Sequence, residues 1–194
     1  MVEILSEARQ RGFLGPGPVE AHAAHAAPLA PLLPSDGTIV DLGSGGGVPS
    51  LILALARPEA AWVLVEAQQR RARGLVGAVG RHGLSDRVEV YAARAEVVGR
   101  GPWRGRAAAV TARSFGPPAV TAECAAPLLE IGGTCWVSEP PSTGPDRWPP
   151  AALAGLGLAR RPRGPAGWTG LELVRSCPDR YPRRVGVPAK RPLF

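Results

Sequence analysis

A glycine-rich turn after a short apolar run is the feature that most restricts how this chain can fold. Residues 38–42 read Thr-Ile-Val-Asp-Leu, and residues 43–47 read Gly-Ser-Gly-Gly-Gly. A short apolar run bounded by glycine is typical of a strand buried in a parallel sheet. Glycines lack a Cβ, so the following turn can bend sharply and approach a ligand closely. The pattern predicts a strand, a tight loop and then a helix over residues 49–57.

Strands and helices alternate along the rest of the chain. We predict further strands over residues 62–66, 87–91, 107–112 and 134–138, and helices over residues 68–81 and 117–129. After a proline-rich loop, the pattern predicts a short helix at 150–154 and two last strands at 157–161 and 171–176. Alternation at this spacing is typical of an α/β fold with a mostly parallel, doubly wound sheet. The closing strand pair predicts an antiparallel strand at one edge.

The chain has 194 residues, enough for one domain with a full core. Residues 1–35 are expected to form an N-terminal helical segment, in two pieces broken at Gly-Pro-Gly-Pro (15–18). Residues 36–194 are expected to form the main domain. The oligomeric state stays open, with a monomer favoured.

Charge and cysteine content indicate which ligands and which cellular compartment to expect for the protein. The net charge is +7, and only Lys190 among the 23 basic residues is a lysine. A basic surface favours polyanions such as RNA, although codon bias in a GC-rich genome also enriches arginine. The three cysteines have no CxxC pairing and no histidine at metal spacing, so we expect buried thiols and no metal. With no targeting segment and no run of membrane-spanning length, a cytoplasmic protein without membrane contact is expected.

The glycine spacing indicates the kind of ligand. It is GxGxG, with Val48 in the sixth place, rather than the GxGxxG of dinucleotide-binding enzymes. Glu66 ends the second predicted strand about 20 residues later, where an acid that binds ribose is expected. Asp41 can address a ligand ammonium group or structure the loop. Together with Gly45 and Gly47, Asp41 and Glu66 predict a site for a nucleoside ligand that carries no pyrophosphate, namely S-adenosyl-L-methionine. The alternative is a glycine loop that only packs the helix on the strand.

Several further motifs accompany this loop. The stretch 41–49 fits D-[LV]-G-[ST]-G-x-G-x-P, 64–71 fits L-[VL]-[DE]-x-x-x-[KR]-R, and 94–96 read R-A-E. Residues 112–115 read A-R-S-F, close to S-R-A-F, and 124–133 resemble C-A-P-L-L-x-x-G-G. The tail 181–190 fits Y-P-R-R-x-G-x-P-x-K. Together, over residues 20–194, they resemble the guanine-N7 methyltransferases of small-subunit ribosomal RNA, the glucose-inhibited division protein B family.

The resemblance implies a Rossmann-like class I methyltransferase domain over residues 36–194, with ribosomal RNA or the small ribosomal subunit as partner. It implies cofactor contacts by five residues: Gly43, Val48, Ala95, Glu96 and Arg113. Guanine N7 carries a free lone pair, so methylation there needs positioning rather than a base. Arg113 follows the fourth predicted strand, at the methyl donor, and is the catalytic candidate. Phe115 is expected either to stack on a base or, the favoured reading, to fill the core.

The chain also departs from the family pattern. The longer N-terminal region with its W-N-x-x-x-N-L-T segment has no match here. His25 stands where the H-x-x-D-S stretch has aspartate, and Glu139 begins a Glu-Pro pair where lysine-glycine is common. These departures keep two alternatives open: another RNA or a small molecule as acceptor, or a non-catalytic RNA-binding relative.

The histidines and the basic side chains have more than one interpretation. His22 and His25, three residues apart on a predicted helix, either flank the site or, as favoured, lie at the surface. The arginines at 70, 71 and 73 are expected to form a solvated helix face. The tail cations either hold RNA phosphates or only add solubility; they are Arg183, Arg184, Lys190 and Arg191.

Overall fold

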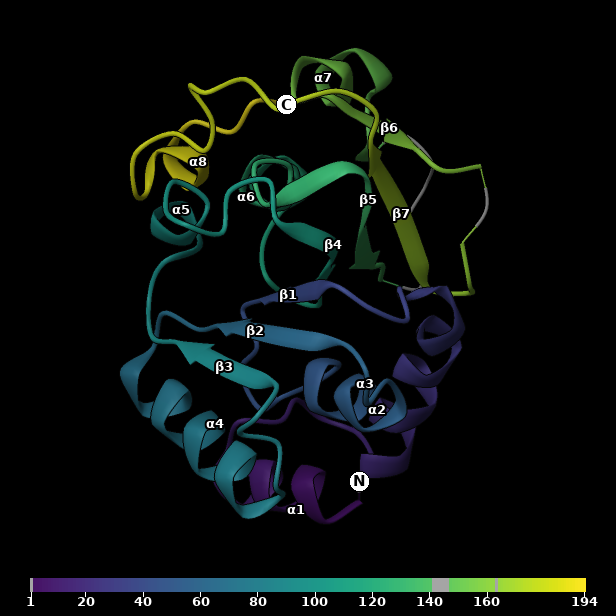
Figure 1. Ribbon diagram of the computed structural model, residues 1–194, viewed down its shortest axis with the longest axis vertical. Helices are drawn as coiled ribbons and strands as arrows, with labels where there is room; N and C mark the ends of the chain where they lie inside the picture. The colour runs from purple at the N-terminus through teal and green to yellow at the C-terminus, as the bar shows by residue number, and fades with distance from the viewer. Residues whose placement is uncertain (1, 141–146, 163) are drawn as a thin grey trace.

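The computed structural model describes residues 2–140, 147–162 and 164–194, and shows a seven-stranded sheet in the order β3-β2-β1-β4-β5-β7-β6 (Figure 1). The strands are β1 (Thr38–Leu42), β2 (Ala61–Val65), β3 (Val88–Tyr91), β4 (Ala107–Ala112), β5 (Leu129–Ser138), β6 (Leu158–Arg160) and β7 (Trp168–Leu173). Strands β1 to β5 are parallel, and β7 runs antiparallel to both β5 and β6. The predicted mostly parallel sheet with an antiparallel strand at one edge is confirmed.

Helices cover both faces of the sheet. They are α1 (Val2–Gln10), α2 (Val19–Ala26), the 3-10 helix η1 (Ala27–Leu32), α3 (Ser50–Ala56), α4 (Gln69–Arg81), α5 (Ala95–Val98), α6 (Pro118–Ala125), α7 (Pro150–Gly155) and α8 (Val187–Lys190). Figure 1 shows α1 to α4 on one side of the central strands, and α5, α6 and α8 on the other. Within the part of the chain that the structure describes, no helix is both long and apolar enough to span a bilayer.

The core has one apolar layer on each face of the sheet. Side chains alternate along β1, so Val40 and Leu42 enter the layer beneath α6, while Ile39 enters the layer beneath α3 and α4. Burial on both faces is what the near-continuous apolar sequence of a parallel strand requires. The second layer also takes in Ile4 and Leu29, so the N-terminal segment packs against the same sheet.

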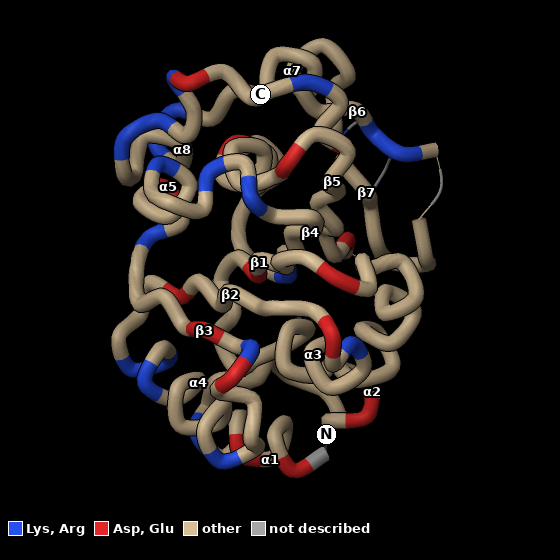
Figure 2. Tube along the Cα trace, viewed as in Figure 1, with Lys and Arg blue, Asp and Glu red and all other residues tan. Residues whose placement is uncertain are grey.

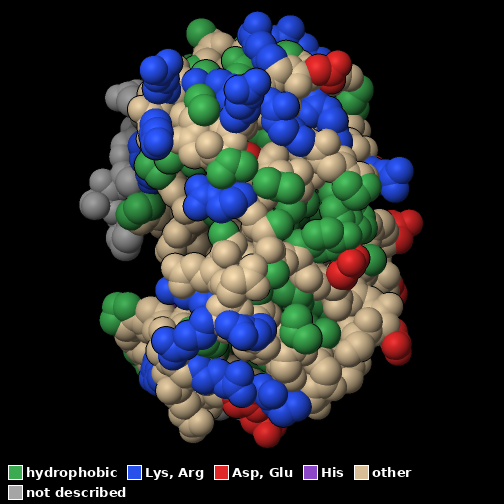
Figure 3. Space-filling view, turned by 90° about the vertical axis from the view of Figure 1, so that its left-hand side faces the viewer, with side chains coloured by type: hydrophobic (Ala, Val, Ile, Leu, Met, Phe, Trp, Pro, Cys, Tyr) green, Lys and Arg blue, Asp and Glu red, His purple; other side chains and the backbone are tan. Residues whose placement is uncertain are grey.

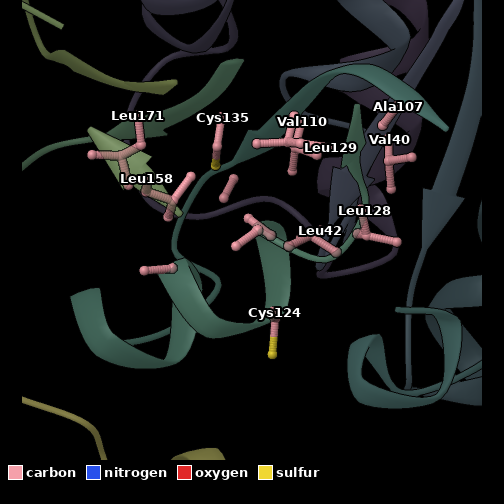
Figure 4. Close-up of a cluster of buried hydrophobic side chains, with 14 of the residues drawn as sticks. Val40, Leu42, Ala107, Val110, Cys124, Leu128, Leu129, Cys135, Leu158 and Leu171 are labelled. Carbon is pink, nitrogen blue, oxygen red and sulfur yellow. The ribbon is translucent and has the colours of Figure 1, made fainter. Parts of the chain in front are cut away.

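The three cysteines are free and buried, as predicted. Figure 4 shows Cys135 on β5 among the apolar side chains of the first layer; Cys124 on α6 belongs to the same layer but points away from the other labelled side chains. Burial raises the pKa of both thiols, and it raises the pKa of Cys177 to about 11. All three therefore act as small apolar side chains rather than as nucleophiles at neutral pH.

Several predicted boundaries were wrong. The helix predicted over 117–129 ends at Ala125, because Pro127 has no backbone N–H to continue the helical hydrogen bonds, and Leu129 already begins β5. The last strand, predicted at 171–176, lies three residues earlier. The short helices α5, which begins at Ala95, and α8 were not predicted.

Candidate active site

The glycine loop joins β1 to α3 at the carboxyl end of the sheet, as predicted. Gly43 and Gly47 have φ of +71° and +85°, a left-handed conformation that favours glycine. Packing adds a second reason, because a Cβ on Gly47 would lie 2.5 Å from Leu51 Cδ1, and one on Gly43 would lie 2.9 Å from Phe115 Cδ2. The loop therefore keeps its shape only with glycine at these two positions.

Glu66 follows β2 directly and holds this loop in place. Its Oε2 accepts a hydrogen bond of 2.9 Å from the Gly45 backbone N–H, and its Oε1 accepts one of 2.7 Å from the Gln68 backbone N–H. The residue is only 5% exposed. Each carboxylate oxygen has a second acceptor position. Glu66 can therefore fix the glycine loop and the start of α4 while still accepting two ligand hydroxyls.

Asp41 lies on β1 directly beneath the loop. Thr111 Oγ1 donates a hydrogen bond of 2.6 Å to Asp41 Oδ1, but Oδ2 is buried and has no partner among the described residues. Burial raises the pKa of Asp41 above its usual range, against the hydrogen bonds that it accepts. A buried carboxylate held in this half-satisfied state is typical of a functional site rather than of a stabilising core contact.

A cavity of about 350 Å³ opens beside the loop. Its lining includes four of the predicted cofactor residues, namely Gly43, Glu66, Ala95 and Glu96. The volume lies within the range of small-molecule sites. The carboxyl ends of β1, β2 and β3 thus bring together residues more than 50 positions apart, as the motif spacing predicted.

Glu96 connects this cavity to the C-terminal segment. Its Oε1 accepts a hydrogen bond of 2.9 Å from the Gly186 backbone N–H, and its Oε2 lies 3.5 Å from Arg94 Nε. Burial raises the pKa of Glu96, but the backbone N–H donors and the Arg94 guanidinium outweigh it and hold the pKa below its usual value. The Glu96 carboxylate is therefore ionised at neutral pH and partly committed to the fold.

The other predicted cofactor residues do not line this cavity. Asp41, Gly45 and Gly47 shape the loop from beneath or within. Val48 packs against a small apolar cluster between α1, α2 and α3. Arg113 lines a second, neighbouring cavity. Direct cofactor contact by these five residues stays a prediction.

The second cavity has a volume of about 420 Å³ and lies at the ends of β4 and β5. Ser114, Phe115 and Gly116 line both cavities and so form a common partition. Ser114 has φ of +53°, the one non-glycine residue in this region of backbone space among those described. Phe115 also packs on the core, as the favoured interpretation predicted, and stacking on a base stays a prediction.

Arg113 is held by a histidine that the sequence placed at the surface. His22 is only 6% exposed, and its Nδ1 lies 2.6 Å from Arg113 Nη2. Because arginine only donates, Nδ1 must accept, so the proton of the neutral ring sits on Nε2. Nε2 lies 3.3 Å from the Gly15 carbonyl oxygen, which accepts that proton's hydrogen bond. The other Arg113 nitrogen, Nη1, is buried and has no partner among the described residues.

His25 and Glu139, the two residues that depart from the family motifs, both line the second cavity. The His25 ring stacks on Trp168 with centroids 5.0 Å apart, and its Nε2 lies 2.8 Å from Ser138 Oγ. Burial lowers the pKa of His25, and the positive charge of Arg113 lowers it further, so the ring is neutral at neutral pH. Glu139 pairs with Arg147 and accepts a hydrogen bond of 2.5 Å from Trp148 Nε1. Sequence reasoning missed Arg147 and Trp148, which lie within the proline-rich stretch before α7.

Solved structures share this fold. TYW2 from P. horikoshii in complex with MeSAdo aligns with a TM-score of 0.56 and 16% identity, over 81% of this chain and 61% of that chain. An O-methyltransferase family protein from Burkholderia thailandensis aligns with a TM-score of 0.56 and 17% identity, over 81% and 58%. The fold is that of the class I methyltransferases.

The sequence comparisons narrow this class to one family. Residues 19–138 match the family model of GidB, rRNA small subunit methyltransferase G, and the chain belongs to this family. Three relatives are named ribosomal RNA small subunit methyltransferase G. The one from Prochlorococcus marinus is 34% identical over 79% of this chain, and the one from Rubrobacter xylanophilus is 38% identical over 81%. The one from Acidothermus cellulolyticus is 44% identical over 68% of this chain. The chain spans 67%, 65% and 59% of their respective lengths.

Proposed function

We propose that this methyltransferase binds S-adenosyl-L-methionine in the first cavity and methylates guanine N7 of small-subunit ribosomal RNA, with the acceptor base in the second. The observation that carries the proposal is the partition at residues 114–116, which lines both cavities at the carboxyl ends of the strands. The family name supports ribosomal RNA as acceptor. The partner would then be the small subunit or its RNA, and the reaction would take place in the cytoplasm on a monomeric enzyme.

The residues of the first cavity fit the cofactor. Glu66 has two acceptor positions for ribose hydroxyls, and Ala95 and Glu96 offer a backbone edge and a carboxylate to an adenine. The buried Asp41 Oδ2 has no partner among the described residues, so it is an acceptor near the loop for a ligand ammonium group. When bound, the cofactor supplies an electrophilic methyl group on a sulfonium.

The second cavity can position a guanine without a general base. N7 is already nucleophilic, so the rate depends on holding the base in line with the methyl group and excluding water. Arg113 carries the buried donor Nη1, which can donate to guanine O6 and leave the N7 lone pair free to attack the methyl group. Phe115 offers an aromatic ring beside the base. We therefore assign Arg113 as the catalytic residue and Phe115 as the stacking residue.

Replacing His22 is expected to affect the reaction through Arg113. Alanine removes the acceptor at Nδ1, and loss of a hydrogen bond from a charged donor costs about 1.5–3 kcal/mol, so we expect kcat to fall at least about tenfold. In His22→Asn the amide oxygen can take the place of Nδ1, whereas in His22→Gln it reaches toward Nε2 and leaves Arg113 without its acceptor. Steady-state kinetics should therefore rank the variants wild type, His22→Asn, then His22→Gln and His22→Ala. Equal kcat for the asparagine and alanine variants would contradict the orienting role.

The function itself is tested by transfer of a radiolabelled methyl group to 30S subunits that lack their own N7 mark, followed by nucleoside analysis. We expect label in 7-methylguanosine, and loss of that label with Arg113→Ala. Calorimetric binding of the cofactor with no label on 30S subunits or on naked RNA would overturn the ribosomal acceptor and favour another substrate. RNA binding without cofactor binding would instead indicate a non-catalytic relative.

A further inference from the structure

The C-terminal segment is fixed to the face that carries the cavities by two buried carboxylates. Glu123 on α6 is fully buried and accepts three hydrogen bonds from Arg183: 2.8 Å from its backbone N–H, 2.8 Å from Nε and 2.6 Å from Nη2. Three residues later, the Gly186 N–H donates to Glu96. Helix α8 follows directly, and Ala189 on it lines the first cavity.

Because the C-terminal segment is anchored in this way, one of its basic side chains points inward and three are exposed. Arg183 points inward: its Nε and Nη2 donate to Glu123, and Nη2 also donates to the Arg191 carbonyl oxygen at 2.7 Å, a structural role that neither sequence interpretation included. In contrast, Arg184, Lys190 and Arg191 are exposed. No described carboxylate forms an ion pair with any of these three. Their positive charges therefore face solvent from a backbone that is already ordered.

A second group of cations lies across the first cavity. The first turns of α4 carry Arg70, Arg71 and Arg73 and no acidic residue in the first turn, and Figure 2 shows basic residues along this helix. Arg71 lines the cavity, while Arg70 lies 5.1 Å from the centre of the Phe13 ring and donates to the Arg11 carbonyl oxygen. Figure 3 shows Lys and Arg side chains gathered at the level of α5 and α8 and again at the level of α4, with few acidic side chains between them.

We propose that these two groups, Arg184–Lys190–Arg191 and the arginines of α4, bind the phosphate backbone of the RNA strand on either side of the cavity mouth. The choice of RNA as ligand rests on the proposed function. Guanidinium groups match phosphate oxygens geometrically, and neutralised phosphates release counterions. Because Glu123 and Glu96 already order the tail, little conformational entropy is lost when its cations bind.

The test compares two triple variants that lose the same charge. One is Arg184→Ala/Lys190→Ala/Arg191→Ala. The other is a control at exposed positions away from the cavity mouth, at the start of β4 and along the β6 edge: Arg106→Ala/Arg160→Ala/Arg175→Ala. Affinity for a fluorescent single-stranded RNA is measured by anisotropy between 50 and 200 mM salt. The affinity of both for S-adenosyl-L-methionine is measured by calorimetry.

We expect the tail variant to lose about 2 from the slope of log K against log salt, because each single-strand phosphate contact contributes about 0.7. Its RNA affinity should fall more than about tenfold, with cofactor affinity unchanged, while the control keeps the wild-type slope. Equal slopes in the two variants, whether both reduced or both unchanged, would overturn the proposal. If the wild type binds RNA with this pattern but does not methylate 30S subunits, the proposed function fails and the RNA-binding surface stands.

Discussion

Glu66→Gln is expected to weaken binding of S-adenosyl-L-methionine by about 100-fold. The glutamine side chain keeps one acceptor oxygen but turns an NH₂ group toward either the Gly45 or the Gln68 backbone N–H, both of which now donate to the carboxylate. Hydrogen bonds to a charged acceptor contribute about 1.5–3 kcal/mol, and about 2.7 kcal/mol corresponds to 100-fold. Calorimetry gives the affinity, and thermal unfolding of the free protein should show a lower Tm because the glycine loop loses its anchor.

Glu89→Gln provides the matched control. Glu89 is exposed on β3, in the strand next to β2, and its register partner is Val63. This variant removes the same charge without touching the loop, so cofactor affinity and Tm should stay at wild-type values. Cofactor affinity of Glu66→Gln within about threefold of wild type, about 0.7 kcal/mol, would rule out Glu66 as the ribose acceptor.

Arg183→Ala is expected to destabilise the protein by about 3–5 kcal/mol, because it leaves the buried Glu123 carboxylate without its partner. The three hydrogen bonds that Glu123 accepts from Arg183 are reduced to one, from the backbone N–H. Urea denaturation followed by circular dichroism measures the free energy of unfolding. The loss should exceed that of Arg180→Ala, in which an exposed guanidinium over the Tyr181 ring is removed.

The double variant Glu123→Gln/Arg183→Ala separates a buried charge from a general packing defect. Removing the charge together with its partner should restore part of the stability lost in Arg183→Ala, since a neutral amide is far less costly to bury than an unpaired carboxylate. A double-mutant cycle then gives a coupling energy of more than about 1 kcal/mol. Strictly additive losses would show that the ion pair does not hold the tail.

The central sheet could be predicted because each of its strands is marked by the residues of that strand alone. Each buried parallel strand is a short apolar run, and Gly43 directly follows the first, so β1 to β4 lie within a residue or so of their predicted positions. Strand β7 was predicted three residues too late, because its position depends on pairing with β5, which is distant in the sequence. Val174 is apolar but 52% exposed, whereas Trp168 and Thr169 are buried because they pair with Ser138 and Val137 of β5.

The candidate site also has a part that could be predicted from local sequence and a part that could not. Gly43, Glu66 and Ala95 meet because each follows a parallel strand, and strand ends can be read from spacing. His22 and Arg113 are separated by 91 positions, and their contact depends on how α2 crosses the end of β4. Nothing in the sequence around His22 marks it as a partner of arginine, so the surface reading was the natural prediction. Only the folded arrangement of the N-terminal segment shows its place in the site.

The partition at Ser114–Phe115–Gly116 has a consequence for inhibitor design. Since the same three residues line both cavities, a single molecule could fill both by joining an adenosine to a purine through a short linker that passes beside Phe115. Linking makes occupation of the second cavity intramolecular, so affinity can exceed that of either fragment by about 10²–10⁴ when the linker matches the span. Selectivity for this protein over other methyltransferases would come from the purine half, which meets His25 and Glu139.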